Sequence, residues 1–268
     1  MIPVIIPFYG RSDQLERCIE HLRCQTVSVE IFVRDNNVNN VFFTVAVNEG
    51  ILRYLDTDCQ YMIVLKQDMY LDPTAVEAMV EFLETHPRAG IAGPLEHTPS
   101  QPEGWVLAGG LDAFPLGKHA CIQKARLTAD RQVHWANGSC MILRKEMIRR
   151  IGLMDENYKL ICSDSDYCFT GRSRGWEVWV VAGAYGVHEH GISAGSSNPS
   201  LELMKVNDIL YFGAKWLTGD LYRRISFEGQ RLGPNDIQEL IARYRQVRAS
   251  LLQSMQGATA QVAANTGH

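Results

Sequence analysis

The chain has 268 residues, of which 46% are hydrophobic and 21% charged, and a formal net charge of −4 at pH 7. This length and composition are typical of one large globular α/β domain, alone or with a small appendage, and they exclude a disordered chain. The charge balance offers no basic patch for nucleic acid, and no stretch approaches the roughly 18 apolar residues of a membrane span.

The N-terminus and the cysteines indicate a cytoplasmic protein. The opening "MIPVIIPFYG" lacks a basic region and a small-residue cleavage site, so we interpret it as a first strand and not as a signal peptide. The seven cysteines form no C-x-x-C pair and are odd in number. They therefore predict reduced, mostly buried thiols instead of a disulfide framework or a zinc site.

The first hundred residues alternate between the period of a buried strand and that of an amphipathic helix. Ser12 or Asp13 is placed to cap the first helix, and Asp72 with Pro73 to begin the third. The alternation predicts an open, mostly parallel sheet with helices on both faces. The predicted strands are 3–7, 29–37, 61–68 and 89–94, and the predicted helices are 11–25, 48–58 and 72–87.

The rest of the chain is less regular. Residues 98–130 are rich in Gly and Pro and predict loops with short strands, and residues 133–158 predict a strand and a helix. Two further helices are expected at 201–216 and at about 235–255, followed by a loose tail. The predicted organisation is a domain over 1–217, a helical extension over 218–256 and a disordered tail over 257–268.

Polar residues follow the strands at the edge where an open parallel sheet binds its ligands, the carboxyl ends of the strands. The acids there are Asp35, Asp68, Asp164 and Asp166. Several common signatures are absent: the G-x-G-x-x-G dinucleotide loop, the G-x-x-x-x-G-K-[ST] phosphate loop, H-E-x-x-H and G-x-S-x-G. Their absence argues against a dehydrogenase, an ATPase, a metalloprotease and a hydrolase.

Seven segments resemble, in order, the motifs of one known family. Each is weak alone, but together they cover roughly residues 2 to 217. They resemble the family 2 glycosyltransferases, which are inverting, nucleotide-sugar-dependent enzymes. The resemblance implies the GT-A fold, an open, mostly parallel twisted sheet with helices on both faces, here with additional C-terminal helices. The segments are "VIIPFYGRSDQLERCIEHL", "VRDNN", "VNEGI", "IVLKQDMYLDP", "WANGSCMILRKEMIRRIGLMDENY", "SDSDYCFTGRSRGW" and "GVHEHGIS".

The resemblance assigns a donor site to the turn after the first strand and to the ends of the next two strands. Asp35 would accept a hydrogen bond from the ring N–H of uracil or thymine, because an ionised carboxylate only accepts, which favours UDP- and dTDP-sugars. Its alternative role is to cap a turn. Residues that would flank the base and ribose are Pro7, Phe8, Tyr9 and Arg11, and the other donor-binding residues are Asn48, Lys66, Gln67 and Asp68.

Asp68 matches the last acid of the family's D-x-D motif, which implies a divalent Mn²⁺ or Mg²⁺ that neutralises the departing diphosphate. His188 would add an imidazole ligand, with His190 as the second candidate, although a histidine beside glycines can equally be a loop residue. Lys66 departs from the family pattern, because a protonated lysine cannot ligate a metal. It would contact a phosphate or ribose oxygen, or lie in solvent at the end of the strand.

The segment "CSDSDYCFTGR" resembles the family's catalytic segment, with Ser163 in place of the usual Glu. Asp164 then corresponds to the base that removes the proton of the acceptor hydroxyl during inverting transfer. Asp166 is expected to anchor local structure through Arg172 or Arg174. The alternative for both acids is a solvated acidic turn.

The segment "HWANGSCMI" resembles the acceptor side of the family's site, which makes Trp135, Asn137 and Gly138 predicted acceptor-binding residues. An exposed Trp135 would stack on a sugar face, whereas a buried one would belong to the core. Gly138 would allow a close approach of the backbone.

The last predicted helix is amphipathic, and its apolar stripe carries arginines along its flanks. Such a helix can rest on an anionic membrane that carries a lipid-linked acceptor, or it can dock on the domain or on a second subunit of a homodimer. The stripe contains Ile237, Leu240, Ile241, Tyr244, Val247 and Leu251, and the arginines are Arg243, Arg245 and Arg248.

The sequence thus predicts an inverting glycosyltransferase that moves a sugar from a nucleoside diphosphate to a hydroxyl of a glycan or glycolipid. Two alternatives stay open. A non-catalytic nucleotide-sugar-binding protein is favoured by Lys66 and by the short segment between Asp35 and Asn48. A nucleotidyltransferase that makes nucleotide-sugars would need a glycine-rich loop after the first strand, which "PFYGRSD" lacks.

Overall fold

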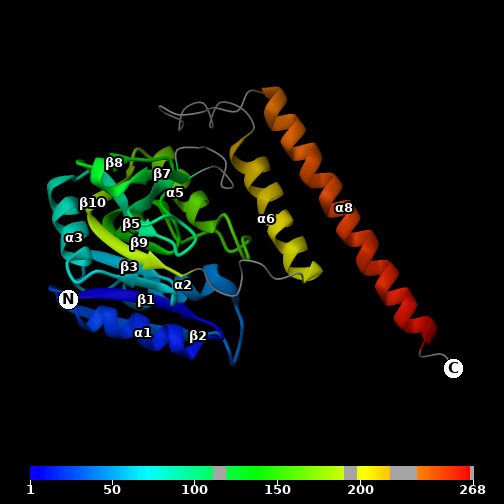
Figure 1. The fold of residues 1–268 in the computed structure, drawn as a ribbon, viewed down its shortest axis with the longest axis horizontal. Coiled ribbons are helices and arrows are strands. Elements are labelled where there is room, and N and C mark those ends of the chain that lie inside the picture. Colours follow the sequence, from blue (N-terminus) through cyan, green and yellow to red (C-terminus); the bar gives the residue numbers. More distant parts are fainter. Residues whose placement is uncertain (111–118, 190–197, 218–233, 266–268) are drawn as a thin grey trace.

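The computed structural model of the chain describes residues 1–110, 119–189, 198–217 and 234–265 (Figure 1). Its strands are β1 (Ile2–Phe8), β2 (Val29–Asp35), β3 (Tyr61–Leu65), β4 (Met69–Leu71), β5 (Ala89–His97), β6 (Trp105–Gly110), β7 (His119–Gln123), β8 (Arg131–Gln132), β9 (Cys140–Arg144) and β10 (Glu177–His188). Its helices are α1 (Ser12–Arg23), α2 (Phe42–Tyr54), α3 (Ala75–Thr85), α4 (Lys145–Ile151), α5 (Ser163–Ser173), α6 (Pro199–Trp216) and α8 (Pro234–Asn265), with a 3₁₀ turn at Lys124–Arg126.

One open sheet organises the described residues, in the order β2-β1-β3-β9-β5-β10-β4. Strands β1, β2 and β3 run parallel, as do β5 and β10, while β9 lies antiparallel between β3 and β5. The carboxyl ends of β1, β2, β3, β5 and β10 therefore meet at one edge. The predicted mostly parallel sheet with flanking helices is confirmed.

Both faces of the sheet are buried. On β1, Ile5 packs into one cluster of the core, and Val4 and Ile6 pack into the other. Successive side chains of a strand point to opposite faces, so a continuous apolar run supplies both clusters. Burial on both faces explains why the continuous apolar run "PVIIP" predicts a buried strand.

Several boundaries differ from the prediction. The N-cap residue of α1 is Arg11, without a side-chain cap from Ser12 or Asp13, and α3 begins at Ala75 after Thr74, not at Pro73. Helix α2 begins at Phe42, six residues before the predicted start. Thr44 and Val47 are buried, and their packing outweighs the modest helix propensity of β-branched residues.

Two elements extend beyond what the local pattern showed. Residues Met69–Leu71 form β4, which pairs antiparallel with the end of β10, a contact between segments far apart in the chain. Helix α8 continues to Asn265, past the predicted end near residue 255, and so occupies much of the segment expected to be a loose tail. The division at residues 217 and 256 remains a prediction.

Helices α6 and α8 lie side by side at one side of the molecule, with the C-terminus at the far end of α8 (Figure 1). Ile237 of α8 is buried, and Ile241 lies close to Gly213 of α6. The helix thus docks on the rest of the chain, one of the two outcomes expected from its apolar stripe. Within the described residues, no helix is both long and apolar enough to cross a membrane.

Candidate active site

The turn between β3 and β4 carries Asp68 to the carboxyl edge of the sheet. Because β4 pairs with β10, Asp68 comes to lie beside His188, the last residue of β10. The backbone N–H of Glu189 donates to the carbonyl of Asp68 at 3.0 Å, and His188 Nε2 lies 3.5 Å from Asp68 Oδ2. The structure therefore brings together the two predicted metal ligands, both buried.

Lys66 joins this pair from the end of β3. Its Nζ lies 3.5 Å from Asp68 Oδ1 and 3.4 Å from His188 Nε2. Its backbone is fixed, since its N–H donates to the carbonyl of Ser139 at 2.8 Å. The side chain is about one third exposed, so its ammonium reaches from solvent to a buried carboxylate.

Glu96 is the member of the cluster that the sequence reasoning missed. Its Oε2 lies 3.4 Å from His188 Nδ1, opposite the nitrogen that faces Asp68. A carboxylate on the second nitrogen fixes the orientation of an imidazole and raises its basicity. The signal was available, because Glu96 is the last residue but one of the buried strand β5, which the prediction stopped at Pro94.

The charges of the cluster support one another. Burial disfavours the ionised carboxylate of Asp68, but the contact with His188 and the charge of Lys66 outweigh it and hold the pKa of Asp68 below its ordinary value. Burial likewise disfavours the charged imidazole, but Asp68 and Glu96 outweigh it and raise the pKa of His188. Asp68 is therefore held as a carboxylate.

The turn after β1 is tied to the same place by Gln67. Its Oε1 accepts from the backbone N–H of Tyr9 at 2.8 Å, and its Nε2 donates to the carbonyl of Arg11 at 3.2 Å. Pro7 and Phe8 end β1, and Tyr9 and Arg11 are exposed. The predicted base-binding turn thus stands next to the end of β3.

Asp35 lies opposite Phe8 in the register of β1 and β2. It is exposed, and its Oδ1 accepts from the backbone and side-chain nitrogens of Asn37, both at 2.8 Å. This is the turn-capping geometry considered from the sequence.

Asp164 stands in the first turn of α5 and is partly exposed. Its Oδ2 accepts from the backbone N–H of Gly138 and its Oδ1 from that of Ser165, each at 2.8 Å. A Cβ added at Gly138 would lie 3.0 Å from Asp164 Oδ2, so the glycine permits this close approach. Two backbone donors fix the carboxylate while leaving lone pairs for a substrate.

The segment from Asn137 to Ser139 connects Asp164 to the Asp68 cluster. The hydroxyl of Ser139 donates to Glu96 Oε1 at 2.6 Å, and Asn137 Nδ2 donates to Glu96 Oε2 at 3.1 Å. Ser139 also accepts from the backbone of Lys66. Gly138, between them, contacts Asp164. Three residues therefore join the predicted base to the predicted metal site.

Two predicted residues lie in other surroundings. Trp135 is 3% exposed and covers Gly110, so it belongs to the core and not to a sugar-stacking surface. Asn48 is buried, and its Nδ2 donates to the carbonyl of Met154 and to Glu156, each at 2.9 Å. The side-chain amide of Asn48 thus makes its hydrogen bonds inside the protein. The geometry gives no support to the predicted role of Asn48 in binding the nucleotide-sugar.

Asp166 anchors local structure, but through other partners than the two predicted arginines. Its buried carboxylate accepts from Tyr158 at 3.0 Å, from Trp216 Nε1 at 2.6 Å and from Lys215, so it ties α5 to α6. Burial raises the pKa of Asp166, although Lys215 opposes this. Asp208 of α6, also missed from the sequence, accepts backbone N–H groups of residues 159–161, the loop that leads to α5.

The residues present fit a divalent ion in part. Both buried oxygens of Asp68 lack a hydrogen bond of ordinary length from the described residues, and an imidazole nitrogen lies beside them. Within the described ranges, no group of three or more His, Cys, Asp or Glu side chains is arranged to hold a metal. An ion here would therefore need further ligands from a substrate. His190 lies outside the described residues.

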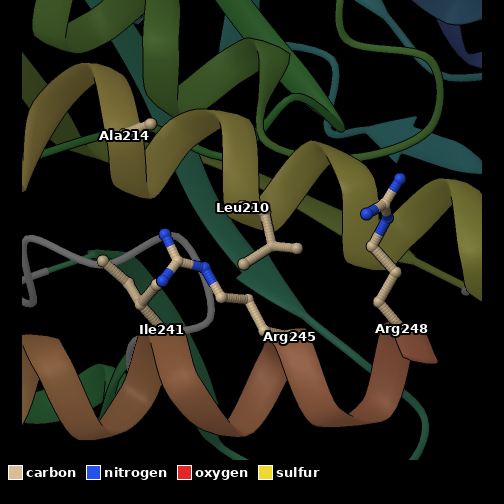
Figure 2. A pocket seen from close by; sticks show the side chains of 5 residues that line it. All are labelled: Leu210, Ala214, Ile241, Arg245 and Arg248. Carbon is tan, nitrogen blue, oxygen red and sulfur yellow. The ribbon is translucent and has the colours of Figure 1, made fainter. Parts of the chain in front are cut away.

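A separate groove of about 510 Å³ lies between α6 and α8. Figure 2 shows Leu210 and Ala214 of α6 facing Ile241, Arg245 and Arg248 of α8 across it. None of these is a predicted site residue. Three of the groove's lining side chains are apolar, and the other two carry guanidinium groups.

Two characterised relatives match most of the chain, whereas no protein-family model matches it. An N-acetylglucosaminyl-diphospho-decaprenol L-rhamnosyltransferase of Mycobacterium tuberculosis (strain ATCC 25618 / H37Rv) is 27% identical over 242 residues, covering 73% of this chain and 78% of the relative. The rhamnosyltransferase WbbL of Escherichia coli (strain K12) is 22% identical over 219 residues, covering 70% and 83%.

The fold matches solved glycosyltransferase structures. GalNAc-T7, crystallised with UDP, GalNAc and Mn²⁺, has a TM-score of 0.64 at 16% identity, and the match covers 92% of this chain and 54% of that one. TarS 1–349 of S. aureus has a TM-score of 0.53 at 12% identity, covering 91% and 70%. The relatives are named as rhamnosyltransferases and the architecture matches solved glycosyltransferases. The chain is therefore a glycosyltransferase with the GT-A fold, and it is similar to family 2 in the order of its motifs.

Proposed function

We propose that the protein is an inverting glycosyltransferase with Asp164 as its base. It moves a sugar from a nucleoside diphosphate, UDP or dTDP, to a hydroxyl of a glycan or lipid-linked acceptor. The observation that carries this proposal is the carboxylate of Asp164, oriented by Gly138 and Ser165 and joined through Ser139 to the charged cluster around Asp68.

The chemistry needs one carboxylate on the acceptor side. As the acceptor oxygen attacks the anomeric carbon, its proton passes to Asp164, and the bond from that carbon to the diphosphate oxygen breaks on the opposite face. A single displacement inverts the configuration. A glycosidase would instead place a pair of carboxylates across the bond.

The donor lies along the edge that Asp35, Gln67 and Asp68 share. Oδ2 of Asp35 would accept the ring N–H of uracil or thymine, and the turn Pro7–Arg11 would flank the base and ribose. The ammonium of Lys66 would meet the diphosphate as a point charge. Gln67 holds this turn against the end of β3 and so keeps the two halves of the donor site together.

A divalent Mn²⁺ or Mg²⁺ would be held by Asp68 and His188, the two side chains whose chemistry suits it. When bound, it would neutralise the charge of the departing diphosphate. The presence of Mn²⁺ with UDP in the solved GalNAc-T7 supports this proposal. Glu96 orients His188 for this role.

The acceptor is proposed to be lipid-linked, because one relative acts on a decaprenol diphosphate. Beyond Glu239, α8 carries Arg243, Arg245 and Arg248 and no acidic residue. Such a helix would rest on an anionic membrane beside that acceptor. Both relatives are named rhamnosyltransferases, and one of them an L-rhamnosyltransferase, so L-rhamnose is the first sugar to test.

The test is a panel of UDP- and dTDP-sugars, including an L-rhamnosyl donor, assayed for protein stabilisation and for transfer to a polyprenyl-diphosphate glycan. The proposal predicts stabilisation by one nucleotide class and a product of inverted anomeric configuration. Binding without transfer to any acceptor would favour a non-catalytic nucleotide-sugar-binding protein, and a product of retained configuration would contradict the proposed mechanism.

A further inference from the structure

The ammonium of Lys66 lies against both side chains that would hold the metal. It is 3.5 Å from Asp68 Oδ1 and 3.4 Å from His188 Nε2, while His188 Nε2 is itself 3.5 Å from Asp68 Oδ2. Four atoms of these three residues thus converge, and Lys66 contributes the ammonium nitrogen among them. The same two partners define the place of a divalent ion.

The position of the lysine is set by its backbone. Its N–H donates to the carbonyl of Ser139, and its carbonyl accepts from Met69 at 3.1 Å. These bonds hold the backbone of Lys66 and leave its long side chain free to change rotamer. The side chain is about one third exposed. Its ammonium can therefore remain at Asp68 or turn outward toward a bound phosphate without any change of fold.

The buried carboxylates supply the reason for a cation at this place. Asp68 and Glu96 are 1% and 3% exposed, and they lie on the two sides of the His188 ring. A buried carboxylate is costly without a counter-charge, and Lys66 provides one to Asp68. A divalent ion would provide the same charge to the same oxygens, and like charges repel strongly at such distances.

We propose that Lys66 and a divalent ion are alternative occupants of one cation position between Asp68 and His188. The ammonium fills this position in the metal-free protein, so a diphosphate finds a positive charge there without any ion. A metal that binds must displace the ammonium, which weakens its affinity for the protein alone. This proposal deepens the proposed function, on which its diphosphate part rests.

The experiment compares the wild type with Lys66→Met, which keeps the length and removes the charge, and Lys66→Arg, which keeps the charge. Binding of UDP and dTDP is measured by calorimetry in EDTA and in Mn²⁺, and binding of Mn²⁺ alone by electron paramagnetic resonance. Lys205→Met is the matched control, because Lys205 of α6 is also partly buried and paired with a carboxylate, that of Glu202.

The wild type and Lys66→Arg are expected to bind the nucleotide in EDTA. Lys66→Met should bind it at least tenfold more weakly in EDTA and recover in Mn²⁺, since a charge-assisted contact commonly contributes that much. Lys66→Met should also bind Mn²⁺ alone at least tenfold more tightly than the wild type.

The proposal is overturned if the wild type needs Mn²⁺ to bind the nucleotide, or if Lys66→Met leaves the nucleotide affinity in EDTA or the Mn²⁺ affinity unchanged. Failure of the donor site itself looks different, because then neither UDP nor dTDP binds the wild type under either condition. In that case the Mn²⁺ measurement still decides whether Lys66 and the ion compete.

Discussion

At the scale of single residues, the contact between Gly138 and Asp164 is the most constrained feature of the site. A Cβ at Gly138 would meet Asp164 Cβ and Oδ2 at 3.0 Å, which is tighter than most real contacts. Gly138→Ala should therefore push the carboxylate from its position and lower kcat at least tenfold, while nucleotide affinity changes less than about twofold. Steady-state kinetics and nucleotide titration measure both quantities. Gly183→Ala is the control, because its added Cβ would lie at an ordinary 3.6 Å from Ala78. An unchanged kcat in Gly138→Ala would show that this contact does not position the base.

At the scale of elements, the hydrogen bonds of Asp166 hold α5 against α6 and the loop before it. Asp166→Ala leaves Lys215, Trp216 and Tyr158 without their shared acceptor. Removing one partner of a buried ion pair typically costs about 3 to 5 kcal/mol of stability. Because Lys215 is partly exposed, we expect the free energy of unfolding to fall by about 3 kcal/mol. The free energy of unfolding in urea measures it. Asp56→Ala, an exposed position after α2, should change that free energy by less than about 0.5 kcal/mol. A loss as small in Asp166→Ala would contradict the anchoring role.

At the scale of the whole molecule, α8 carries exposed arginines and exposed apolar side chains. Val247 and Leu252 are 40% and 36% exposed, and Arg243 and Arg245 are exposed beside them. Each arginine near an anionic surface contributes about 1 kcal/mol, so Arg243→Gln/Arg245→Gln should weaken binding to phosphatidylserine vesicles about 30-fold. Vesicle sedimentation measures this, with neutral vesicles and the exposed Arg23→Gln variant as controls. Equal binding of the double variant and the wild type would contradict a membrane role of this surface.

Much of the fold was predictable because it rests on local periodicity. Strand β1 and helix α1 can each be predicted from the spacing of their own apolar residues. Strand β4 was not predictable in this way, because three residues form a strand only through pairing with β10. The early start of α2 also depends on burial against the sheet, which no local propensity contains.

The position of Asp68 at the edge of the sheet was predictable because this residue follows β3. The role of Asp164 stays a prediction that rests on its motif. The site was not predictable where a side chain acts on another side chain. Glu96 and Asp208 gain their roles from His188 and from the loop at 159–161, and only the tertiary structure joins them. The burial of Trp135 and the internal hydrogen bonds of Asn48 likewise depend on tertiary contacts, which the sequence pattern does not contain.

The most direct test of the account is the rate of sugar transfer by Asp164→Asn. The amide can still accept the backbone N–H of Gly138 but cannot take a proton, and general base catalysis commonly contributes a factor of about 100 to 10,000. We predict that transfer falls at least about 100-fold while donor affinity stays within about twofold, and that Asp58→Asn, at an exposed turn, behaves as the wild type. Transfer by Asp164→Asn at the wild-type rate would contradict the assignment of Asp164 as the base.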